Sequence, residues 1–109
     1  MFGRSTQFTG DPANVDEGIR IYKEEVVPAV QGQPGFKGAI SLSDRSSGKG
    51  ISITFWETEE ELRASESAAN QVRSDTLAKL GITEPPTVDR MEVTYFEVSA
   101  PVGSSEAAE

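Results

Sequence analysis

The side chains available for chemistry are limited, because the chain contains no histidine and no cysteine. Without histidine it lacks the usual general base near neutral pH and the commonest metal ligand. Without cysteine it cannot form a disulfide, a thiolate nucleophile or a cysteine–metal site. Any chemistry must therefore use carboxylates, hydroxyl groups, lysine, arginine or the substrate itself.

Small and hydroxyl-bearing residues recur at helical spacing in the second half of the chain. Ser65, Ala69 and Thr76 share one predicted helix stripe with larger aliphatic residues. A helix that packs tightly on a sheet usually carries larger aliphatic residues on its buried stripe. The stripe therefore indicates either a close approach of helix and sheet or a space between them.

The stretch 51–62, ISITFWETEEEL, predicts a strand that leads directly into a capped helix. Residues alternate with period 2 up to Trp56, which is typical of a strand. Thr58 stands at the N-cap with a glutamate three residues later, which forms a capping box. The alternation places Trp56, the only tryptophan, on the strand face of Ser52 and Thr54.

The remaining elements follow from periodicity and breakers. Asn14 is expected to cap the first helix, and Pro28 to kink or loosen its last turn because proline lacks an N–H. Gly81 is expected to end the second helix. The predicted strands are 2–9, 36–43, 51–56 and 87–99, and the predicted helices run from Asn14 to about Val30 and from Glu59 to about Leu80.

This β-α-β-β-α-β order predicts an α+β, ferredoxin-like fold, with two helices on one face of a four-stranded antiparallel sheet. The strands are apolar on both faces, which a sheet with one solvated face would not show. We therefore expect a second copy of the sheet to cover the other face in a homodimer. One domain is expected over residues 1–99, followed by a disordered acidic tail over 100–109.

The charge balance and the sequence termini restrict partners and location. The net charge of −8 disfavours nucleic acids and anionic membrane surfaces. No apolar run approaches the roughly 20 residues of a membrane-spanning helix. The N-terminal residues lack the apolar segment of a secretory signal, so a cytoplasmic protein is expected.

Three segments resemble the antibiotic biosynthesis monooxygenase-like family. They are 10–38, with PGFKG at its end, 53–73, with TFWETEEEL, and 88–98, VDRMEVTYFEV. The resemblance covers about residues 1–99. It implies a dimeric α/β barrel, in which two ferredoxin-like sheets face each other.

The resemblance also implies a ligand cavity between the helices and the inner face of the sheet. The expected cavity residues are Trp56, Tyr22, Ser65, Ala69, Asn70 and Thr76. No catalytic residue is assigned, and Arg4, Arg63 and Arg73 are expected to be solvated or paired with glutamate. No metal, haem or other cofactor is expected, because the haem-degrading members use a histidine that this chain lacks.

Two functions remain open at this stage. The first is a cofactor-independent monooxygenase-like protein that acts on or binds a small aromatic molecule. The alternative is a non-catalytic dimeric protein that binds a small molecule or serves as a stress-related accessory protein. An enclosed cavity of roughly 300 Å3 or more favours the first, and a space filled by side chains favours the second.

Overall fold

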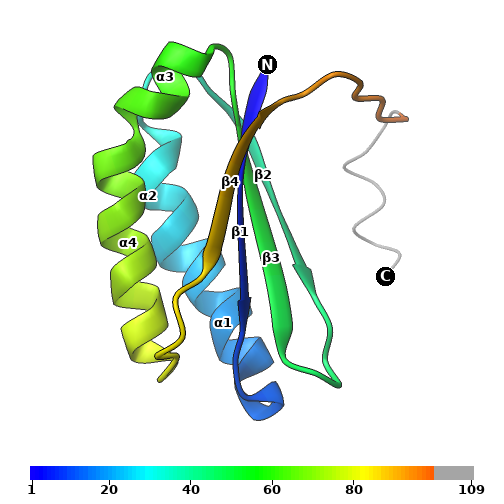
Figure 1. Ribbon diagram of the computed structural model, residues 1–109, viewed down its shortest axis with the longest axis vertical. Helices are drawn as coiled ribbons and strands as arrows, with labels where there is room; N and C mark the ends of the chain where they lie inside the picture. Colours follow the sequence, from blue (N-terminus) through cyan, green and yellow to red (C-terminus); the bar gives the residue numbers. More distant parts are fainter. Residues whose placement is uncertain (100–109) are drawn as a thin grey trace.

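Residues 1–99, which the computed structural model describes, form one antiparallel sheet covered on one face by helices (Figure 1). The strands are β1 (Phe2–Thr9), β2 (Phe36–Ser43), β3 (Lys49–Trp56) and β4 (Thr87–Glu92). The first helical segment comprises the 3-10 turn η1 (Pro12–Asn14), α1 (Val15–Ile21), the π-helical turn η2 (Tyr22–Val26) and α2 (Val27–Gln31). The second comprises α3 (Glu59–Ala64) and α4 (Glu66–Lys79). The predicted tail, 100–109, lies outside the described residues.

The strand order is β2-β3-β1-β4, and every neighbouring pair is antiparallel. This confirms the ferredoxin-like fold that the element order predicts. No helix within the described part of the chain is long and apolar enough to cross a membrane.

The two faces of the sheet differ in chemistry. On the helix-covered face, Arg4 and Thr6 of β1 lie opposite Thr54 and Ser52 of β3. The other face carries no helix (Figure 1) and is apolar mainly over β2 and β3, whereas β1 and β4 place Ser5, Gln7 and Asp89 on it. It presents Ile40, Leu42, Ile53, Phe55 and Met91, with Leu42 54% and Met91 61% exposed.

The core is concentrated at the α3 end of the sheet. Val30, Trp56, Leu62 and Ala69 are buried there, with Phe2 and Phe36 packed against them. Trp56 is completely buried and meets the ring of Phe36 edge to face, with 5.5 Å between ring centroids. The tryptophan therefore closes one end of the space between sheet and helices.

The first helical segment departs from the prediction at its start and in its middle. Asn14 makes no side-chain cap hydrogen bond, because it is the last residue of the 3-10 turn, which the Asp11 carboxylate caps by accepting from Ala13 N. Before Pro28 the hydrogen bonds switch to π-helical register, and Val27 N–H donates to Tyr22 O. The irregularity thus lies one turn earlier than the last turn, where it was expected.

The second segment begins as predicted and is then interrupted. Thr58 Oγ1 accepts from Glu61 N at 3.1 Å, which confirms the capping box. The helix breaks at Ser65, whose hydroxyl donates to Leu62 O at 2.7 Å and so competes with the helical hydrogen bonds. Gly81, with φ of +70°, ends it as predicted.

The last strand is shorter than the predicted 87–99. Strand pairing ends at Glu92, opposite Phe2, because β1 begins there. One further hydrogen bond joins Val93 N to Met1 O at 2.8 Å. Beyond it the chain leaves the sheet (Figure 1, orange), and Tyr95 and Phe96 are exposed.

Candidate ligand cavity

A cavity of about 100 Å3 lies between the helices and the polar face of the sheet. Its helical wall comes from both segments and is mostly apolar: Val15, Tyr22, Val26, Val30, Ala69, Val72, Thr76, Leu77 and Leu80. An aromatic ring would find large apolar side chains on this side.

The floor of the cavity is formed by the sheet and carries hydroxyl groups. Thr6, Ser41, Ser52 and Thr54 line it from three adjacent strands. Alternation places these four side chains on one face, because their strands pair in a register that matches polar with polar residues. A ligand in the cavity would meet hydrogen-bond donors on one side and apolar side chains on the other.

Tyr22, Ala69 and Thr76 are the three predicted cavity residues that line this space. The Tyr22 hydroxyl donates to Ile40 O at 3.1 Å, and burial raises the pKa of Tyr22 to about 12. Tyr22 therefore stays protonated near neutral pH and is not a general base. Thr76 Oγ1 donates to Val72 O at 2.8 Å, so its hydroxyl hydrogen is already engaged within the helix.

Trp56, Ser65 and Asn70, the other three, are not among the described residues that line the cavity. Trp56 has the predicted parity but lies in the core beyond the cavity, and its Nε1 donates to Thr54 Oγ1 at 3.0 Å. Ser65 is buried at the helix break. Asn70 is exposed on α4, where its Oδ1 accepts from Arg73.

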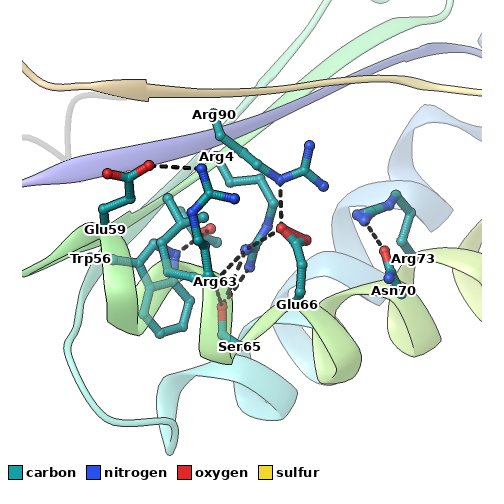
Figure 2. A network of polar contacts seen from close by, with 11 residues as sticks. Arg4, Trp56, Glu59, Arg63, Ser65, Glu66, Asn70, Arg73 and Arg90 are labelled. Atoms are coloured by element: carbon teal, nitrogen blue, oxygen red, sulfur yellow. Dashed lines mark hydrogen bonds and ion pairs between the residues drawn. The ribbon is translucent and has the colours of Figure 1, made fainter.

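Arg4 lines the cavity and was missed as a site residue. It is only 4% exposed, and its guanidinium donates to Leu62 O and Ser65 Oγ (Figure 2). It also lies over the Trp56 ring, 5.6 Å from the centroid, and 3.6 Å from the Glu66 carboxylate. The pairing with glutamate was expected, but the burial was not.

Two arginines, Arg4 and Arg90, pair with the Glu66 carboxylate at the end of the cavity near Trp56, and a third arginine lies nearby. Arg90 Nε donates to Glu66 Oε2 at 2.5 Å, and Arg73, which also lines the cavity, lies close enough to interact with the same charge. Burial lowers the pKa of Arg4 and of Arg73, and Glu66 opposes both shifts. The closed end of the cavity is therefore electropositive within a chain of net charge −8.

The signal for Arg4 was present in the β1 alternation, which places it on the face of Phe2, Thr6 and Phe8. The strand register was needed to show that this face is covered by helices. Arg63 behaves as expected, since it is exposed and pairs with Glu59 on the first turns of α3 (Figure 2).

No protein family model matches the chain. It is 33% identical over 93 residues to the uncharacterized protein Rv2557 of Mycobacterium tuberculosis, an alignment that covers 85% of this chain and 41% of that protein. The uncharacterized protein Rv2558 of the same organism is 42% identical over 65 residues, 60% of this chain and 28% of the relative. The chain thus spans less than half the length of these curated relatives.

Among solved structures, the chain is similar to a monooxygenase from the gene ActVA-Orf6 of Streptomyces coelicolor, in complex with the ligand nanaomycin D. The TM-score is 0.70 at 20% identity, covering 91% of this chain and 92% of the other. A mutant form of SnoaB, a cofactor-independent oxygenase from Streptomyces nogalater, gives a TM-score of 0.57 at 16% identity, with 92% and 96% covered.

Other structural neighbours carry the description antibiotic biosynthesis monooxygenase. The structural neighbours are thus proteins of the antibiotic biosynthesis monooxygenase family, in the dimeric α/β barrel superfamily. At these identities the likeness shows a shared fold, and function depends on the site.

Proposed function

We propose that this protein is a homodimer that binds a small aromatic molecule between its sheet and helices and oxidises it as a cofactor-independent monooxygenase. The observation that carries this proposal is the inverted polarity of the sheet. Hydroxyl groups and Arg4 lie on the face that the helices cover, where a cavity remains, while the large aliphatic side chains lie on the open face. A domain that folded only to bury apolar surface would place its large aliphatic side chains under the helices and its hydroxyl groups on the open face.

The chemistry suited to this cavity uses the substrate as its own reductant. A phenol that has lost its proton is electron-rich at the ring carbon para to the oxygen, and that carbon bonds O2. The O–O bond then breaks, one oxygen atom stays as a carbonyl, and the other leaves as water with the ring hydrogen and the phenol hydrogen. For 1-naphthol the products are 1,4-naphthoquinone and one water, which balances atoms and electrons.

The residues at the site suit individual parts of this reaction. The electropositive end formed by Arg4 and Arg73 favours the phenolate over the phenol. The apolar helical wall excludes water from the reacting ring. The Ser52 and Thr54 hydroxyls supply hydrogen bonds that orient the substrate.

The size of the cavity favours the second candidate, a non-catalytic binding protein. Its volume of about 100 Å3 lies below the roughly 300–1,000 Å3 of sites for drug-sized ligands. The cavity as it stands suits a single ring. A protein that only binds such a molecule needs neither oxygen nor room for a product.

Oxygen consumption with phenol, whose single ring fits the cavity, and with 1-naphthol distinguishes the two candidates. The monooxygenase predicts stoichiometric oxygen uptake and one 18O atom in the quinone when 18O2 is supplied. Saturable binding in calorimetry without oxygen uptake would support the binding protein and contradict the enzyme. If 1-naphthol and phenol neither bind nor react, both candidates fail.

A matched pair of variants on α4 locates the site. Thr76→Phe places a ring in the cavity and is expected to weaken ligand binding about tenfold or more. Ala78→Phe adds the same ring at an exposed position of the same helix and should leave binding unchanged. Equal effects of the two variants would show that the ligand does not occupy this cavity.

A further inference from the structure

A second hollow of about 360 Å3 lies directly outside the cavity. Five residues border both spaces: Gly10, Asp11, Asn14, Leu80 and Ile82. The two spaces are therefore neighbours that share one wall. This wall lies at the end of the cavity away from the Trp56 core, where β1 ends and β4 is about to begin.

One side of the wall, Leu80 and Ile82, comes from the turn that ends α4. Gly81 N–H donates to Ala78 O at 3.1 Å, and Ile82 N–H donates to Leu77 O at 2.9 Å. This pair of bonds, with φ of +70° at Gly81, is a Schellman motif. The motif holds Leu80 and Ile82 on either side of the glycine.

Each of these two side chains lies against a glycine on the opposite side of the opening. A Cβ atom on Gly18 of α1 would lie 3.6 Å from Leu80 Cδ1, an ordinary contact. A Cβ atom on Gly10, after β1, would lie only 2.9 Å from Ile82 Cδ1, a separation that requires Ile82 to move. Because position 10 has no side chain, the end of the Ile82 side chain lies directly against the backbone there.

The two spaces differ in polarity. The cavity has an apolar helical wall, whereas the outer hollow is lined mostly by polar residues at its rim: Thr9, Asp11, Asn14, Thr83 and Glu84. A ring fits the inner space, and a hydroxyl-bearing group fits the outer one, where it would find hydrogen-bond acceptors.

We propose that the cavity and the outer hollow are two parts of one ligand site, and that Ile82, packed on Gly10, is the closure that sets the length of ligand the site admits. This inference rests on the proposed ligand-binding function. The full ligand is an elongated aromatic molecule with a hydroxyl group at its outer end, and it occupies both spaces when Ile82 swings away. With Ile82 in place, only a single ring is enclosed.

Calorimetry with three phenols of increasing length tests the closure: phenol, 4-phenylphenol and biphenyl-4,4′-diol. Ile82→Ala is expected to raise the affinity for the two-ring phenols relative to phenol by about tenfold or more, since a few methylene groups in an apolar site carry that discrimination. The diol should gain more than 4-phenylphenol, because its far hydroxyl reaches the polar hollow. Ile82→Leu keeps a side chain of the same size and should retain the wild-type order of affinities for the three phenols. Circular dichroism of both variants reports whether the fold is retained.

A double-mutant cycle with Gly10 gives an independent test. Gly10→Ala pushes Ile82 aside. It should raise the affinity for the two-ring phenols relative to phenol by a smaller factor than Ile82→Ala does. In the Ile82→Ala background, Gly10→Ala should change nothing, because the colliding side chain is gone. Equal effects of Gly10→Ala in both backgrounds would contradict the proposed contact between position 10 and the Ile82 side chain.

The outcomes separate this inference from the function on which it rests. If phenol binds and the affinity for the two-ring phenols relative to phenol is the same in the wild-type protein and Ile82→Ala, the proposal that Ile82 closes the site is wrong. The proposed ligand binding is then still supported. If no phenol binds any folded variant, both proposals fail. A larger gain for 4-phenylphenol than for the diol would refute the polar outer part of the site.

Discussion

Arg4 carries a buried charge that depends on a small set of partners. Its guanidinium has Leu62 O, Ser65 Oγ, the Glu66 carboxylate and the Trp56 ring around it. Burying a charge is costly unless it is paired and hydrogen-bonded. The same residue thus joins β1 to the helix break and supplies positive charge to the cavity.

Replacing Arg4 should be much more destabilising than replacing an exposed arginine. Arg4→Met leaves Glu66 with one fewer partner and removes one of the donors to Leu62 O and to Ser65 Oγ, and breaking a buried pair typically costs about 3–5 kcal/mol. Arg63→Met is the matched control, because its pair with Glu59 is exposed and worth at most about 1 kcal/mol. Urea unfolding at neutral pH measures the loss of stability in both variants. Similar losses would show that the burial of Arg4 does not contribute to stability.

Tyr22 should make the protein sensitive to alkaline pH. In the unfolded chain its hydroxyl ionises near its ordinary value of 10, whereas burial raises the folded pKa to about 12. The folded state therefore holds this proton longer, so stability is complete below pH 10 and falls as pH rises toward 12. Between pH 9 and 11 the loss should be about 1 kcal/mol greater in the wild-type protein than in Tyr22→Phe. Parallel urea-unfolding profiles for the two proteins would contradict the assignment.

At the scale of elements, the two helical irregularities position the site. Pro28 cannot donate a hydrogen bond, and the preceding turn widens so that Val27 N–H reaches Tyr22 O. Tyr22 and Val26, the first and last residues of this turn, line the cavity, and Ile21, directly before it, is completely buried.

The turn after α4 can be tested with two glycines that differ in backbone angle. At Gly81 and at Gly32, a Cβ atom would have no neighbouring atom within 4 Å, so alanine meets no obstacle at either position. Gly81 has φ of +70°, where alanine is strained, and Gly81→Ala should cost about 1 kcal/mol. Gly32 has φ of −84°, and Gly32→Ala should be neutral or stabilise by up to about 1 kcal/mol through the unfolded chain. Thermal unfolding gives both changes in stability. A loss of stability for Gly32→Ala as large as for Gly81→Ala would show that the backbone angle of Gly81 is not the cause.

At the scale of the whole molecule, the open face of the sheet is the surface through which we propose the dimer forms. Ile40, Leu42 and Met91 are exposed on it, and Phe96 packs on Phe55 at its margin, 5.6 Å between centroids. A second copy would cover these side chains with the same ones, as in a two-fold symmetric contact.

A charge placed on this face should separate the dimer. Ile40→Glu puts a carboxylate into a contact that would otherwise be apolar, and light scattering at micromolar concentration should show monomers. Ala78→Glu adds the same charge to an exposed position of α4 and should leave the dimer intact. A monomeric wild-type protein, or a dimer that survives Ile40→Glu, would contradict the proposed interface.

The sequence alone determined the type and the order of the elements. The capping box at Thr58, the end at Gly81 and the alternation around Trp56 are local signals, because they depend on neighbours within a few residues. Element order then led to the ferredoxin-like fold. These features require no knowledge of which distant residues meet.

The tertiary structure decided which of these residues meet at the cavity. Thr54 lines it and Trp56 does not, although both lie on one strand face, because the core fills the space at one end of that face. Arg4 is buried because β1 is an interior strand of the sheet and lies beneath the helix break. The last strand, β4, ends at Glu92 because β1 has no further residue to pair with it. Such outcomes depend on strand register and on contacts between residues far apart in the chain, which periodicity does not encode.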